Sequence, residues 1–237
     1  MTPRTLLVLG TAALAVLAGV TSADLARGSL PDDRAVAAEL TPSPSATWVP
    51  TGKLKRVDTI ELDAEAITLR DGRRTVSVAS MRDAGTTVRL LTRLLGSPSR
   101  SQTPEGSGGR CYPATTTSTW GGAVRVAALA TPSALGNSVE VRVLRDEVRT
   151  RAGDLVELQG PHGVQVGDDV EDRIRHADAD DRESLGSEDA EAWQVLLEDG
   201  WSSDHRGAGR NGVSALTDGT TVTVIGSPMP VHATRGC

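Results

Sequence analysis

The chain has 237 residues, of which 38% are apolar and only 2% aromatic, with four Trp, one Tyr and no Phe. This length suits one sizeable domain or two small ones, and the core must consist mainly of Val, Leu, Ala and Ile. The formal net charge is −6, and no basic stripe is present, which argues against nucleic acid as a partner.

The first 23 residues are typical of an export signal. A basic start, Met1–Arg4, precedes an apolar run of about 16 residues, and the small residues Thr21-Ser22-Ala23 precede Asp24. Because about 20 residues span a bilayer, we expect a cleaved signal peptide, with an uncleaved N-terminal membrane anchor as the alternative. No cysteine follows the run, which excludes a lipoprotein anchor. The protein is therefore expected to be secreted or anchored at the outer face of the cell membrane.

Residues 24–55 are predicted to form a tether, because proline, serine and threonine in this stretch disfavour both helix and sheet. Its prolines are Pro31, Pro42, Pro44 and Pro50. Such a tether would hold a folded part away from a membrane or let it reach through a wall.

Residues 56–150 are predicted to form a first α+β unit. Alternating apolar positions around Asp71-Gly72 predict a hairpin, and Asp83 is expected to cap a helix that runs to Leu95 and ends at Gly96. The expected buried face of this helix is Ala84, Val88, Leu91 and Leu95. Further expectations are a loop over 97–109 and strands over 120–129 and 138–144.

Residues 151–237 are predicted to form a second unit after a charged connector at 145–154. The stretch Gly163–Gly167 alternates like a strand, and Asp168 with Glu171 has the spacing of a capping box. The expected buried helix face is Val170, Ile174 and Ala177. Further expectations are strands over 155–158 and 193–197, a loop over 177–190, and a hairpin around Thr217-Asp218-Gly219 between strands 213–216 and 221–225.

Both units thus have the order β-β-α-β-β. The predicted fold class is α+β, with two tandem units whose antiparallel sheets are each covered by a helix, after the signal and tether.

The two cysteines, Cys111 and Cys237, share no C-x-x-C motif and have no nearby histidine that would complete a zinc site. In an exported protein, a disulfide between them is expected, with two unpaired thiols as the alternative. It would close a loop of more than a hundred residues, worth about 4–5 kcal/mol in the chain-entropy model.

No motif identifies a catalytic, cofactor-binding or metal-binding residue, so none is predicted. His162, His176, His205 and His232 lack the spacing of a metal site, and a calcium loop starting at Asp178 fails because Arg182 and Glu183 occupy its fifth and sixth positions. His176 is expected at the end of the second helix, where a cation is favourable. The sequence also lacks G-x-S-x-G, Walker A and G-x-G-x-x-G motifs.

The stretches Gly163–Asp168 and Leu95–Pro98, with Cys111 and Cys237, resemble uncharacterised secreted or lipoprotein-type proteins of high-GC Gram-positive bacteria. This resemblance covers residues 60–237 and implies no catalytic residues. The tandem α+β layout is also similar in outline to β-lactamase-inhibitor proteins, although that family has a sheet face rich in aromatic residues.

These observations favour an exported, non-enzymatic envelope or secreted module that binds an envelope protein or a wall component through a sheet face. The alternative is an exported hydrolase at the junction of the two units, which would use His162 or His205 with nearby acids. A third hypothesis is a cation-responsive protein that acts through Asp168–Glu191, where eleven acidic residues face three arginines.

Overall fold

A computed structural model describes residues 49–106, 113–133, 135–187, 190–201 and 212–233, all within one compact unit, Ser43–Cys237. The predicted signal, most of the predicted tether, Cys111, Cys237 and His205 lie outside these ranges. Within them, no helix is long and apolar enough to cross a membrane.

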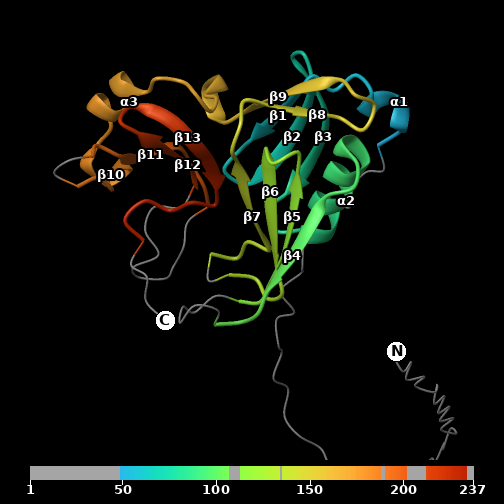
Figure 1. The fold of residues 1–237 in the computed structure, drawn as a ribbon, viewed down its shortest axis with the longest axis horizontal. Coiled ribbons are helices and arrows are strands. Elements are labelled where there is room, and N and C mark those ends of the chain that lie inside the picture. Colours follow the sequence, from blue (N-terminus) through green and yellow to red (C-terminus); the bar gives the residue numbers. More distant parts are fainter. Residues whose placement is uncertain (1–48, 107–112, 134, 188–189, 202–211, 234–237) are drawn as a thin grey trace, which may run out of the picture. The chain divides into compact units, whose positions relative to one another are not determined.

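The predicted α+β class is confirmed, with two sheets and short helices (Figure 1). The five-stranded sheet has the order β3-β2-β1-β9-β8, formed by β1 (Thr59–Leu62), β2 (Ala66–Asp71), β3 (Arg74–Ser80), β8 (Glu147–Arg149) and β9 (Leu155–Gln159). The eight-stranded sheet has the order β10-β11-β12-β13-β7-β6-β5-β4, formed by β4 (Ser99–Thr103), β5 (Thr115–Trp120), β6 (Val124–Leu129), β7 (Val139–Val143), β10 (Arg182–Ser184), β11 (Trp193–Asp199), β12 (Gly212–Asp218) and β13 (Thr221–Ser227). The helical elements are α1 (Thr51–Leu54), α2 (Ala84–Leu95), α3 (Glu171–His176) and the 3-10 turns η2 (Pro161–Gly163) and η3 (Ala179–Asp181).

Each sheet combines strands from both halves of the chain, which differs from the prediction of one antiparallel sheet per unit. β1 pairs in parallel with β9, and β7 pairs antiparallel with β13. The half that ends with β7 contributes three strands, β1 to β3, to the smaller sheet, and the other half contributes the hairpin of β8 and β9. In each half a helix and a four-stranded meander of the larger sheet then follow. The pairing between the halves joins segments far apart in sequence, so no local pattern could predict it.

The helix predicted after Asp83 is confirmed as α2. The Asp83 carboxylate accepts a hydrogen bond from the Thr86 backbone N–H at 2.9 Å, and Gly96 follows the helix with φ +91°. The buried face is broader than expected, because α2 packs against both β3 and β6. Its buried residues are Thr86, Thr87, Leu90, Leu91, Leu94 and Leu95, whereas Ala84 and Val88 are only partly buried.

Both predicted hairpins are confirmed. Gly72, with φ +56°, connects β2 to β3, and Gly219, with φ +59°, connects β12 to β13. Positive φ is accessible to glycine without steric cost, which is why these short turns could be predicted from sequence.

The predicted strand at Gly163–Gly167 is wrong. The segment forms η2 and a turn, in which the Asp168 carboxylate accepts from the Gln165 N–H at 2.8 Å and does not cap the helix. Asp169 accepts instead from the Glu171 N–H, at 2.9 Å, where α3 begins. The expected helix face is retained in part, with Val170 and Ile174 buried and Ala177 partly buried.

The predicted strand over 120–129 is also wrong at its start, because Trp120 ends β5 and a turn at 121–123 leads into β6. The stretches predicted as connector or loop contain β4, β8 and β10. All three are edge strands, where polar and charged side chains are common because they discourage pairing with another chain.

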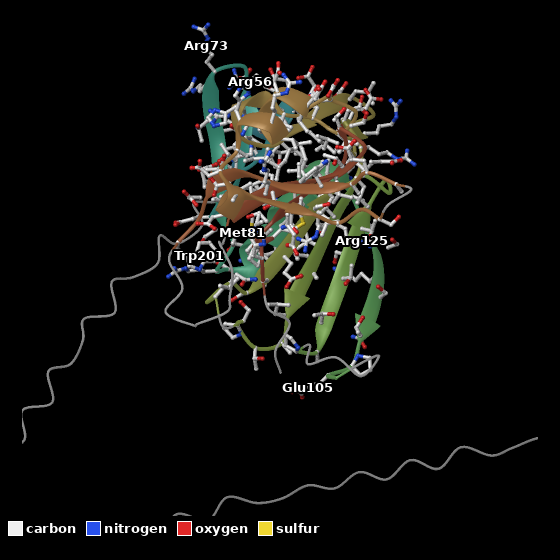
Figure 2. All side chains as sticks on the ribbon, turned by 90° about the vertical axis from the view of Figure 1, so that its left-hand side faces the viewer. Arg56, Arg73, Met81, Glu105, Arg125 and Trp201 are labelled. Carbon is white, nitrogen blue, oxygen red and sulfur yellow. The ribbon has the colours of Figure 1, made fainter. Side chains whose placement is uncertain are left out.

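Met81 lies in the interior and joins the two sheets (Figure 2). Its N–H donates to the Glu65 carbonyl at 2.8 Å, and its own carbonyl accepts from the Ser138 N–H at 2.8 Å. At the N-terminal end of the described chain, Val49 and Leu54 are buried as well. The packed unit therefore begins before residue 56.

Candidate functional site

A cluster of carboxylates lies where the two sheets meet. Asp63 follows β1, and its carboxylate accepts a hydrogen bond from the Thr68 hydroxyl at 2.5 Å. Burial raises the pKa of Asp63, and the negative charge of Glu61 raises it further. Partial desolvation also raises the pKa of Glu198 on β11, a largely exposed residue, with a second contribution from the charge of Asp63. Two carboxyl groups from strands far apart in sequence are thus coupled.

A bulge in β11 positions Glu198. The register between β11 and β12 shifts between Leu196 and Glu198, and the Glu198 carbonyl lies so close to Gly212 that a Cβ there would be 2.0 Å away. Only glycine permits this approach of the two backbones.

His162 belongs to the same region, because η2 contacts both β1 and β11. Its backbone has φ +60°, which is unusual for a non-glycine residue. The positive charge of His162 lowers the pKa of Glu198, whereas the negative charge of Asp63 raises it. The structure therefore brings together one of the two histidines of the hydrolase hypothesis and acids from both halves. Among the described residues, however, His162 makes no hydrogen bond to a carboxylate, which a base and its orienting acid would require.

The other described histidines have structural contacts. His176 ends α3, and its Nδ1 lies 2.7 Å from the Asp172 carbonyl oxygen, in agreement with its expected position. The backbone N–H of His232 donates to Glu183 at 3.1 Å, and its Nε2 lies 3.0 Å from the Ala179 carbonyl oxygen.

The acidic stretch Asp168–Glu191 is held in part by local ion pairs. Arg175 contacts Glu171 at 2.5 Å and Asp172 at 3.1 Å, all on the exposed surface of α3. Within the described ranges, no group of three or more His, Cys, Asp or Glu side chains is arranged to hold a metal ion.

A second candidate is the outer face of β4–β6, which we call the hydroxyl face. Cross-strand pairing places Thr117 between Ser101 and Ala127, and Thr119 between Ser99 and Arg125. These six side chains are exposed or half-exposed, whereas Val124 and Val126 of β6 are buried on the opposite side. The Trp120 indole N–H on that inner side donates to the Gly96 carbonyl at 2.9 Å, so α2 covers the inner face of these strands.

Charge is present at one border of the hydroxyl face. Arg125, which is labelled in Figure 2, lies directly opposite Arg142 of β7, whose pKa is lowered by burial. At the far end of β4–β6, a hollow of about 640 Å³ is lined by Gln102, Thr103, Pro104, Ala114, Thr115, Thr116, Ala128, Leu129 and Ala130. The face therefore combines hydroxyl donors and acceptors, cations and an adjoining depression.

Comparisons with protein-family models, with curated proteins and with solved structures find no match for this chain. No activity, substrate or partner is therefore carried over from a relative. Sequence reasoning named His162 but missed Asp63, Glu198 and the hydroxyl face. The uninterrupted run of hydroxyl residues at 115–119, Thr-Thr-Thr-Ser-Thr, was the available signal for that face.

Proposed function

We propose that the chain is an exported, non-enzymatic module that binds an envelope protein or a wall component through the hydroxyl face. The single observation that carries this proposal is a half-exposed sheet face of hydroxyl side chains whose opposite side is covered by α2. A pleated row of hydroxyl groups offers regularly spaced donors and acceptors to a polar partner.

The predicted export signal at residues 1–23 and the predicted tether after it support the same proposal, since they would place the module at the outer face of the cell membrane or beyond it. We also propose the disulfide between Cys111 and Cys237, because an oxidising compartment favours it. Both halves have the order of antiparallel strands, helix and four-stranded meander, which favours a tandem duplication as the origin of the fold.

The test is co-sedimentation of the exported protein with wall fragments and envelope membranes of its host. The double variant Thr117→Glu/Ala127→Glu adds two charges to the hydroxyl face, and we expect at least about a tenfold loss of binding. Val78→Glu is the control. Val78 lies on β3, in the smaller sheet and outside the hydroxyl face, and it is 52% exposed. No sedimentation of the wild type, or equal loss in the two variants, would contradict the proposal.

The alternative function is an exported hydrolase at the carboxylate cluster. The observation that favours it is the pair of carboxyl groups with raised pKa values, Asp63 and Glu198, in the neighbourhood of His162. A carboxyl group that titrates closer to neutrality is better suited to proton transfer. A panel of esterase, peptidase and glycosidase substrates tests this alternative. Turnover that is lost in both His162→Ala and Glu198→Gln would favour it over the binding module.

A further inference from the structure

A basic groove is lined by residues of α1, of the C-terminal end of α2 and of the loop that joins β8 to β9. Figure 1 shows α1, α2 and β8 on the same side of the fold. Its volume is about 360 Å³, within the range of small-molecule sites. Its polar rim consists of Thr51, Lys55, Arg93, Thr150, Arg151 and Asp154. We propose that this groove binds a phosphate-bearing anion, at a site separate from the hydroxyl face and independent of the function proposed there.

The charge of the groove is the first argument. Asp154 is the single carboxylate among the lining residues, and Lys55 and Arg151 alone outweigh its charge, in a chain whose net charge is −6. No ion pair involves Lys55 or Arg151 among the residues that the structure describes, whereas Arg56, Arg70 and Arg175 each pair with a carboxylate. A cleft lined by one sign of charge attracts a counter-ion.

The fixed backbone around the groove is the second argument. The floor of the groove is formed by Leu54 and Leu94, both buried. The Arg93 guanidinium donates to the Val49 carbonyl, and the backbone N–H of Arg151 donates to the Leu94 carbonyl at 2.9 Å. The loop itself is held because the Thr150 hydroxyl oxygen accepts from the Asp154 N–H at 3.2 Å. A preorganised site loses less entropy when it binds its ligand.

The negative end of the α2 dipole accounts for part of this arrangement, since cations are favourable at a helix C-terminus. The dipole of α2 does not account for Lys55, because Lys55 is the C-cap residue of α1. The chain has only two lysines, and Lys55 lines the groove while Lys53 lies within α1 beside it. Guanidinium, ammonium and hydroxyl donors together match the several acceptor oxygens of a phosphate group.

The phosphate could belong to a free metabolite or to a lipid headgroup. Val49, at the start of the described chain, contacts Arg93 of the groove. If residues 1–23 remain as an anchor, residues 24–48 could span at most about 90 Å between the membrane and the groove, at ~3.6 Å per residue.

Binding is tested with the exported protein as recovered from its host. Calorimetric titration with inorganic phosphate covers the free anion, and co-sedimentation with phosphatidylglycerol vesicles against phosphatidylcholine vesicles covers the headgroup. The groove variant is Lys55→Gln/Arg151→Gln. The matched control, Arg73→Gln/Arg100→Gln, removes the same charge from exposed arginines outside the groove. Protection of Lys55 from an amine-reactive reagent, read by peptide mass spectrometry, provides a second measurement on the unmutated protein.

We expect saturable binding that weakens about tenfold or more in the groove variant and less than about twofold in the control. Binding of inorganic phosphate with protection of Lys55 would identify a free phosphate ligand, and binding of the anionic vesicles alone would identify a lipid headgroup. Absence of both, or equal weakening in the two variants, would overturn the proposal. Neither result would bear on the hydroxyl face, which contains none of these residues.

Discussion

Asp83 fixes the start of α2 through two hydrogen bonds, from the Thr86 N–H at 2.9 Å and from the Thr86 hydroxyl at 2.5 Å. Asp83→Ala is expected to lower the free energy of unfolding by about 1 kcal/mol at pH 7, measured by urea denaturation. The hydroxyl bond from Thr86 lowers the pKa of Asp83, so its stabilising effect is present above the ordinary Asp value of about 3.9 and is lost as the pH falls through the folded value. The free energies of unfolding of the wild type and of Asp83→Ala should therefore become equal at acidic pH. Asp83→Asn is the control, and a loss as large as that of Ala would contradict a capping role.

Glu198 affects the pH dependence of stability in the opposite direction to Asp83. Although this side chain is largely exposed, its partial desolvation raises its pKa, so the folded protein binds a proton more readily than the unfolded chain. Stability therefore falls as the pH rises from the ordinary Glu value of about 4.3 through the folded one. Glu198→Gln should remove this loss and stabilise the protein at pH 7 by at most about 1 kcal/mol, because the side chain is exposed. The gain should vanish near pH 4 in denaturation curves recorded across pH. Glu191→Gln, exposed and outside the cluster, should show no such gain.

At the scale of elements, the bulge in β11 depends on the missing side chain of Gly212. A Cβ there would lie 2.0 Å from the Glu198 carbonyl oxygen, so Gly212→Ala must push β11 and β12 apart. We expect a loss of about 2–3 kcal/mol in chemical denaturation. Gly52→Ala is the matched control, because a Cβ at Gly52 would meet nothing within 4 Å. Equal stability of the two variants would mean that the strands can yield without cost.

For the whole molecule, pairing between the halves predicts one cooperative unfolding transition. Leu158 on β9 is fully buried and lies opposite Ile60 of β1, so Leu158→Ala should cost about 2–5 kcal/mol. Midpoints followed by tryptophan fluorescence and by far-UV circular dichroism should coincide and shift together. Leu155→Ala, on the same strand but 50% exposed, should have little effect. Two separate transitions would indicate that the halves fold independently.

The sequence allowed prediction of features that depend on neighbouring residues. The Asp83 cap and the turns at Gly72 and Gly219 belong to this group, because capping and positive φ are local chemistry. The edge strands could not be recognised, since their polar composition matches that of loops. The candidate carboxylate cluster was out of reach because Asp63 and Glu198 are 135 residues apart and meet only through the packing of the two sheets.

The parallel pairing of β1 with β9 also has a consequence for the order of synthesis. Ile60 is made 98 residues before its partner Leu158, and β7 must likewise wait for β13. Until the second half has emerged from the ribosome, the first half keeps two open strand edges and cannot complete either sheet. If the chain is exported as we propose, this delay would keep it unfolded while it is threaded across the membrane and would leave final folding to the far side.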